Sequence, residues 1–153
     1  MDTARLKPWS LLLLRIGTGL LLVLWGVLRV TTPAAGPSLA NKYYSGLLDV
    51  QAVQIAFGAA EVALGLLVVL GLFGRIAYPL QALILVPGAL MLWRYLVDPL
   101  GMWLLSPENS QILFFPSIAV AAATLTLIAF REFDLLSLDA FLASRKSAHE
   151  PRR

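Results

Sequence analysis

The sequence predicts an all-α fold, a polytopic membrane four-helix bundle with short interfacial helices, in one membrane domain. Of its 153 residues, 59% are hydrophobic and only 14% are charged, whereas a soluble domain carries roughly a quarter charged residues. The apolar residues form four long runs. Each run is close in length to the about 20 residues that a helix needs to cross a hydrocarbon core. The Lys and Arg residues gather at the ends of these runs, which is the pattern of membrane topology.

The first predicted transmembrane helix covers residues 9–30. Trp9 suits one membrane interface, and Arg29 can snorkel to the other. Small residues follow the run, as they follow a cleaved signal peptide. The apolar stretch is longer than a typical signal core, however, and contains Arg15 and Trp25. We therefore expect a helix that stays in the chain.

Residues 31–49 are expected to connect this helix to the next. Pro37 and Ser38 can open a short helix, because proline favours the first helical turn. Tyr43 and Tyr44 follow within that helix, and tyrosine is enriched at membrane interfaces. This segment therefore predicts a short interfacial helix.

The next two runs predict an antiparallel helical hairpin. The second helix is expected at residues 50–73 and the third at residues 76–97, with a tight turn at Gly74 and Arg75 between them. The third run contains two prolines, which membrane helices tolerate better than soluble ones do.

The fourth transmembrane helix is expected at residues 107–130, after a loop at residues 98–106. Ser106, Pro107 and Glu108 form a helix start signal, with an N-cap, a proline at the first position and an acid in the first turn. Residues 131–153 form a polar tail. Its stretch from Phe133 to Arg145 predicts an amphipathic helix on the membrane surface.

The basic residues predict a multi-pass protein with both termini in the cytoplasm, since cytoplasmic segments carry an excess of Lys and Arg. The side of the membrane that holds both termini has eight: Arg5, Lys7, Arg75, Arg131, Arg145, Lys146, Arg152 and Arg153. The other side has Arg29 and Lys42, with Arg94 near its edge. Basic residues placed in this way do not suggest nucleic-acid binding.

The composition predicts neither a metal centre nor an enzyme that acts on its own. The chain has no Cys, which excludes disulfides, thiolate nucleophiles and thiolate metal sites. The single His, His149, lies in the tail and not in a span, so the spans lack the ordinary axial ligand of haem. The sequence has no phosphate-binding loop, nucleophile elbow or cluster of metal ligands.

Polar and small residues recur along one face of three predicted helices. The second helix has Gln54, Gly58, Glu61 and Gly65. The first has Arg15, Gly19, Leu22 and Gly26, and the fourth has Ser117, Ala121 and Thr124. Such spacings place residues on one helix face, and glycines let neighbouring backbones approach closely. These stripes predict a tightly packed bundle.

Three ionisable residues lie within the spans: Arg15, Glu61 and Arg94. A charge at mid-membrane costs at least a few kcal/mol unless it is paired. From the estimated depths, Glu61 is expected to pair with Arg15, with Arg94, or with both in turn. Two interpretations stay open: the pair fixes helix register, or it binds a polar head such as a quinone carbonyl or relays a proton.

The candidate ligand-binding or buried polar network thus consists of Arg15, Glu61, Arg94, Gln54 and Gln81. For Gln81 the alternatives are an interhelical hydrogen bond and the lining of a pocket. Five aromatic residues are expected to serve as interfacial anchors or packing groups: Trp9, Trp25, Tyr78, Trp93 and Trp103.

The first two runs resemble DoxX-like proteins. Residues 11–30 carry an Arg, a glycine pair, apolar residues, then a late Gly and a basic residue. Residues 56–77 match better, with a Glu, a Gly-rich Leu run, a short turn and an Arg: Glu61, Gly65, Gly71, Gly74 and Arg75. The resemblance covers residues 9–130, and the matching polar positions are Arg15, Glu61 and Arg75.

The resemblance implies a small four-helix protein of the bacterial or archaeal cytoplasmic (inner) membrane. DoxX-like members include subunits of thiosulfate:quinone oxidoreductase and proposed membrane anchors. It therefore implies a non-catalytic or quinone-adjacent oxidoreductase complex subunit. Membrane lipid and other membrane or peripheral redox subunits are the expected partners. Because the chain lacks Cys and an intramembrane His, no covalently bound cofactor is expected, and either a partner holds the electron carrier or a quinone is itself bound.

Other functions stay open. One is a small carrier or binding protein for a hydrophobic or weakly acidic solute, with Glu61 as its switch. Another is a membrane scaffold or assembly protein without a ligand. Self-association into a homo-oligomer is compatible with each of these functions.

Overall fold

The computed structural model describes residues 3–32, 34–43, 45–46 and 50–149, and over these residues it is helical without a strand. Within that part of the chain, four helices are long and apolar enough to cross a membrane. They are Leu6–Thr31, Gln51–Leu70, Gly74–Met91 and Ile112–Ala129. The predicted all-α class with four apolar helices is therefore confirmed.

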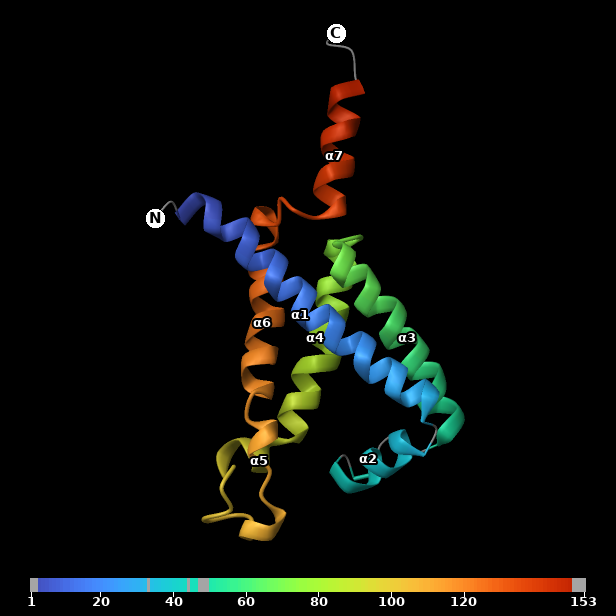
Figure 1. The fold of residues 1–153 in the computed structure, drawn as a ribbon, viewed down its shortest axis with the longest axis vertical. Helices are drawn as coiled ribbons and strands as arrows, with labels where there is room; N and C mark the ends of the chain where they lie inside the picture. Colours follow the sequence, from blue (N-terminus) through green and yellow to red (C-terminus); the bar gives the residue numbers. More distant parts are fainter. Residues whose placement is uncertain (1–2, 33, 44, 47–49, 150–153) are drawn as a thin grey trace.

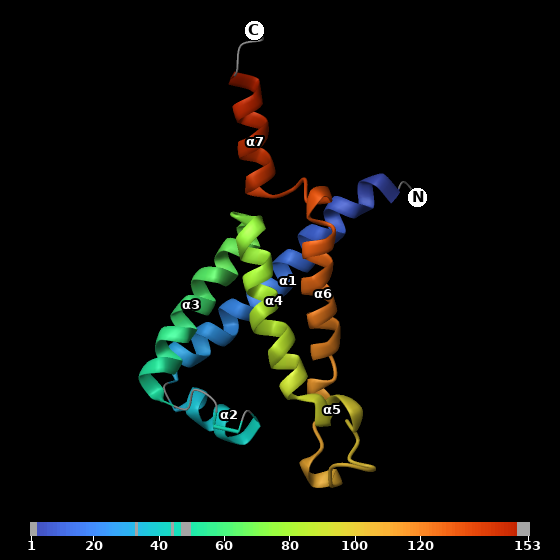
Figure 2. The same ribbon diagram turned by 180° about the vertical axis from the view of Figure 1, so that it is seen from behind.

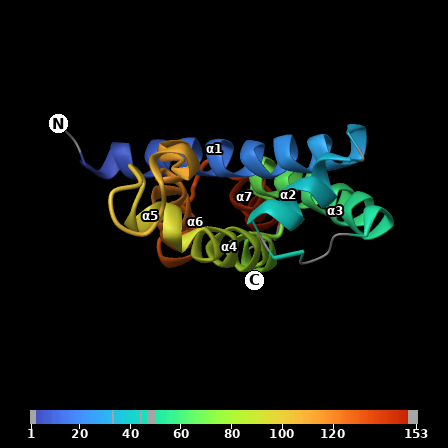
Figure 3. The ribbon, with the colours of Figure 1, turned by 90° about the horizontal axis from the view of Figure 1, so that it is seen from below.

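The long helices are α1 (Thr3–Thr31), α3 (Gln51–Leu70), α4 (Gly74–Met91) and α6 (Ser117–Ala129). Figure 1 shows α3 and α4 meeting at one end and diverging toward the other, with α1 crossing obliquely and α6 beside α4; Figure 2 shows the same arrangement from behind. Seen from below in Figure 3, α1 forms one layer, and α4 and α6 lie on the other side. We call the end with the α3–α4 turn the turn end and the opposite end the loop end.

Helices α1 and α3 cross at glycines, where their backbones touch. Gly19 lies against Gly65, and Gly26 lies against Gly58. A Cβ atom on Gly65 would lie 2.6 Å from the Gly19 carbonyl oxygen, and one on Gly19 would lie 2.9 Å from the Gly65 carbonyl oxygen. All four glycines are buried, so the two predicted stripes face each other.

The predicted hairpin is confirmed, but its turn lies earlier than expected. Helix α3 ends at Leu70, and Gly71 follows in the left-handed conformation with φ of 67°. This conformation suits glycine, which has no Cβ to clash. The N–H of Leu72 bonds the carbonyl of Leu67 at 2.9 Å, which closes the helix end. Gly74 then starts α4 and is not part of the turn.

The helix expected at residues 76–97 is broken. It consists of α4 and a short helix, α5 (Trp93–Val97), with Leu92 between them. The N–H of Leu92 donates to the carbonyl of Ala89, three residues earlier, at 3.1 Å. This spacing makes a tighter turn than the four-residue spacing of an α-helix. The chain changes direction there.

An aromatic cluster joins three elements at the loop end. The short helix expected between the first two spans is present as α2 (Ala35–Tyr43), and Tyr44 lies outside the described residues. The ring of Tyr43 packs edge-on against Tyr95 of α5 and against Phe114, with centroids 5.8 and 5.0 Å away. The rings of Tyr95 and Phe114 are 5.1 Å apart. This contact ties α2 to the opposite half of the molecule.

The fourth helix is shorter than the expected 107–130. Two 3-10 turns, Pro107–Asn109 and Ile112–Phe114, precede α6, which begins only at Ser117. Pro116 is the physical reason, because it has no N–H to donate to the carbonyl of Ile112. The start signal at Ser106 therefore opens a single 3-10 turn and not the long helix.

The tail forms a helix that points away from the bundle. This helix, α7 (Leu138–His149), extends beyond the turn end in Figure 1, whereas a helix lying along the membrane surface was expected. Its base is tied to the α3–α4 turn. The carboxylate of Asp139 accepts the N–H groups of Phe73 at 3.0 Å and Gly74 at 2.8 Å, and the N–H of Asp139 donates to Gly71 at 3.1 Å.

Candidate functional site

A buried polar cluster at the turn end is built around Arg15. Its Nη1 atom donates to both carboxylate oxygens of Asp134, at 2.9 and 3.0 Å, and its Nη2 atom donates to the Leu136 carbonyl at 2.9 Å. The hydroxyl of Tyr78 donates to the same Asp134 carboxylate. Arg15 is only 2% exposed and Asp134 only 5%. The two opposite charges are thus paired inside the fold.

Asp134 reaches this cluster because the chain folds back after α6. A 3-10 turn at Arg131–Phe133 precedes it, and the Ser137 hydroxyl donates to the Asp134 carbonyl at 2.8 Å. Sequence reasoning missed Asp134 because it assigned the residue to the polar tail. The sequence does contain a sign that Asp134 is buried. It lies between Phe133 and Leu135, in a stretch that is too apolar for a solvated tail. Tyr78, expected as an anchor or packing group, is a hydrogen-bonding member of the cluster.

A second polar cluster joins α1 and α3 nearer the loop end. The Nε atom of Arg29 donates to a carboxylate oxygen of Glu61 at 2.8 Å, and its Nη1 atom donates to the side-chain oxygen of Gln54. The Glu61 side chain is 3% exposed, and the Arg29 side chain is 16% exposed. The Arg29 guanidinium also lies over the Phe57 ring, 5.1 Å from its centroid.

The expected pairing of Glu61 with Arg15 or Arg94 is therefore wrong. Helix α1 runs antiparallel to α3, and the Gly26–Gly58 contact places Arg29 beside Glu61. Arg15 lies at the other end of the crossing, beyond the Gly19–Gly65 contact. Arg29 was assigned to snorkelling because it ends the apolar run, yet its side chain turns inward.

The remaining two candidate residues lie outside both ion pairs. Arg94 is exposed, and its guanidinium lies over the neighbouring Trp93 ring, 5.7 Å from the centroid. Gln81 is fully buried in α4, one turn from Tyr78. Neither its amide nitrogen nor its amide oxygen has a hydrogen-bond partner within the described residues. The expected interhelical hydrogen bond of Gln81 is therefore not formed there.

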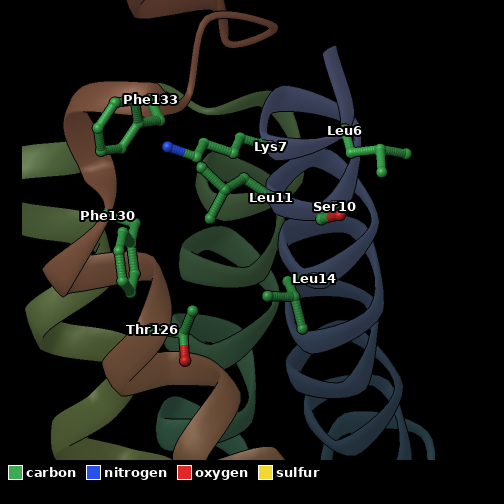
Figure 4. A pocket seen from close by; sticks show the side chains of 8 residues that line it. All are labelled: Leu6, Lys7, Ser10, Leu11, Leu14, Thr126, Phe130 and Phe133. Carbon is green, nitrogen blue, oxygen red and sulfur yellow. The ribbon is translucent and has the colours of Figure 1, made fainter. Parts of the chain in front are cut away.

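A groove opens between the start of α1 and the end of α6, with a volume of about 300 Å³. Its lining residues are Leu6, Lys7, Ser10, Leu11, Leu14, Thr126, Phe130 and Phe133. Figure 4 shows the Lys7 side chain reaching from α1 across to Phe133, and its ammonium lies 4.7 Å from that ring centroid. The rings of Phe130 and Phe133 lie 6.4 Å apart.

Sequence reasoning missed this groove. It interpreted Lys7 only as a topology signal and ended the fourth helix at Phe130. A usable signal was the spacing of Lys7, Ser10, Leu11 and Leu14, which places them on one face of α1. The partner face on α6 follows only from the packing of the two helices.

Within the described residues, no group of three or more His, Cys, Asp or Glu side chains could hold a metal ion. The arrangement instead offers two internal ion pairs and one largely apolar groove with a cation at its rim. No known family, curated protein or solved structure matches the chain.

Proposed function

We propose that this protein is a DoxX-like integral membrane subunit of a redox complex, and that it binds a quinone head in the groove between α1 and α6. The groove is the observation that carries this proposal. A quinone head is a flat ring with carbonyl acceptors on opposite sides. The groove offers aromatic rings at Phe130 and Phe133 and a cationic donor at Lys7.

The chemistry of the groove suits such a head. The Lys7 ammonium can donate to one carbonyl, and the Ser10 hydroxyl lies one turn further along the same face of α1. The volume of about 300 Å³ lies at the lower end of small-molecule sites, roughly 300–1,000 Å³, which suits a single ring. From Leu6 to Leu14 the groove follows α1 for roughly 12 Å, so an isoprenoid tail can leave into lipid.

This location replaces the one first expected, between Arg15 and Glu61. Those two residues belong to separate ion pairs, with Asp134 and with Arg29. The Glu61 carboxylate is already paired with the Arg29 guanidinium. This pairing favours the interpretation that Glu61 fixes helix register, and it disfavours a role for Glu61 as the switch of a solute carrier. In the proposed function the chain binds and orients the quinone, and a partner subunit supplies the electrons.

Replacing Ser10 with Phe should block the groove without changing the fold. Ser10 is exposed and lines the groove, so the added ring occupies the space of the quinone head. We expect quenching of Trp9 fluorescence by a short-chain quinone in nanodiscs to disappear. Lys7→Met should weaken binding at least about tenfold, since a hydrogen bond to a charged group contributes roughly 1.5–3 kcal/mol and about 1.4 kcal/mol is a factor of ten.

The matched control is Leu13→Phe, which adds a ring at an exposed position of α1 that does not line the groove. It should leave quinone affinity unchanged. Equal binding by the wild type, Ser10→Phe and Lys7→Met would exclude the groove as the quinone site.

We propose further that α7 binds the peripheral redox partner. The helix exposes apolar side chains, including Phe141 at 50% and Leu142 at 55%. An isolated helix of about twelve residues is marginal in water, so contact with a partner would stabilise it. The ties of Asp139 to the α3–α4 turn hold the base of α7 and direct it away from the bundle.

The double variant Phe141→Ser and Leu142→Ser should lose this partner. Purification in mild detergent is expected to bring down a redox-active chain with the wild type and not with the variant, because the apolar contact is removed. The control is Ser144→Ala with Ser147→Ala, two exposed positions on the same helix. Wild-type protein that purifies without any redox-active chain would contradict this part of the proposal.

A further inference from the structure

The loop after α5 is folded around one buried carboxylate. Asp98 is fully buried, and its two oxygens accept the backbone N–H groups of four successive residues. The donors, with their distances, are Met102 at 2.7 Å, Trp103 at 2.8 Å, Leu104 at 2.7 Å and Leu105 at 3.0 Å. We call residues 98–106 the Asp98 loop.

A glycine in the left-handed region lets the loop close on itself. Gly101 has a φ of 69°, and a Cβ atom there would lie 2.7 Å from the carbonyl oxygen of Ser106. Burial alone would raise the pKa of Asp98, but the four N–H donors outweigh it and hold the pKa well below its ordinary value. The carboxylate therefore stays ionised and keeps its four donors at any physiological pH.

Several apolar side chains of this loop are exposed. Trp103 is 76% exposed and Met102 is 65% exposed, and Leu100 and Leu104 are also exposed. No charged residue occurs between Asp98 and Glu108. An uncharged apolar surface with an exposed tryptophan suits a membrane interface, where tryptophan is enriched.

We infer that the Asp98 loop inserts into the membrane interface at the loop end. Backbone N–H groups that enter lipid must find partners within the protein, because hydrocarbon offers none. The Asp98 carboxylate supplies them for four residues, and three of these, Met102, Trp103 and Leu104, carry exposed apolar side chains. Large apolar side chains just before the loop are exposed as well, Leu90 in α4 and Trp93 and Val97 in α5.

The test uses a protein in which Trp103 is the single tryptophan, made by replacing Trp9, Trp25 and Trp93 with Phe. It is reconstituted in liposomes of phosphatidylcholine brominated near the head group or deep in the acyl chain. We expect blue-shifted Trp103 emission that the shallow bromines quench most and that aqueous acrylamide quenches little. Trp103 emission typical of a water-exposed tryptophan, quenched by acrylamide and not by either bromolipid, would overturn the inference. Quenching by bromolipid that begins only after a soluble protein is added would also overturn it.

Two variants test whether the carboxylate organises the loop. Asp98→Asn removes the charge that holds the four N–H groups, and Gly101→Ala strains the turn without changing any charge. Both should lose the bromolipid quenching while helical circular dichroism is kept. The matched control, Glu108→Gln at an exposed position just after the loop, should quench like the parent. Unchanged quenching in both variants would show that insertion does not depend on this loop structure. If Asp98→Asn fails to fold, Gly101→Ala decides the question.

Discussion

Replacing Asp134 with Ala is expected to destabilise the protein by roughly 3–5 kcal/mol, because it leaves a buried charge without its partner. The Arg15 guanidinium would keep only the carbonyl of Leu136, and the Tyr78 hydroxyl would lose its acceptor. The free energy of unfolding can be measured by denaturation in mixed detergent micelles. The segment that connects α6 to α7 would loosen as well, which proteolysis should detect.

Two further variants separate this effect from general damage. Glu132→Ala removes an exposed acid two residues away and should change the stability by no more than about 0.5 kcal/mol. The double variant Arg15→Met with Asp134→Leu removes both charges, and it should recover much of the loss because a buried pair is often replaceable by apolar groups. Equal stability of Asp134→Ala and Glu132→Ala would show that the ion pair does not hold the fold.

Replacing Gly26 with Ala should force α1 and α3 apart. The added Cβ would lie 2.8 Å from the backbone nitrogen of Val62, and a backbone atom cannot move aside as a flexible side chain can. Overpacking typically costs about 1–3 kcal/mol, and we expect the upper end of that range here. The separation would also stretch the bond between Arg29 and Glu61. The same unfolding assay measures the effect.

Gly17 provides the matched control on the same helix. A Cβ atom added there meets nothing within 4 Å, so Gly17→Ala should stabilise the helix by roughly 0.5–1 kcal/mol. If the two substitutions had the same effect, the close crossing of α1 and α3 would not be a determinant of stability.

Much of the fold could be predicted from local properties of the chain. Run length alone identified four apolar helices, and the placement of polar and small residues identified the faces of α1 and α3 that touch. The errors lie at helix ends, where single residues decide. Pro116 delays the start of α6, Gly71 ends α3, and the turn at Leu92 separates α5 from α4.

The candidate site was less predictable, because helix faces do not determine which charges meet. The stripe correctly placed Gln54 and Glu61 against α1, but the choice among Arg15, Arg29 and Arg94 depends on how far one helix is shifted along the other. The glycine contacts set that shift, and they select Arg29. The sequence position of Lys7 indicates only membrane topology, whereas the fold places the Phe133 ring beside it.

The residue pattern was enough to predict that the protein is all-α, that four runs are apolar enough to cross a membrane, and which faces of α1 and α3 pack together. These properties depend on residue type and helical period, which are local. The contacts of Arg15 with Asp134 and of Arg29 with Glu61, and the groove between α1 and α6, arise only in the folded chain. Those contacts join residues far apart in the chain, so they depend on helix register and on the return of the segment after α6.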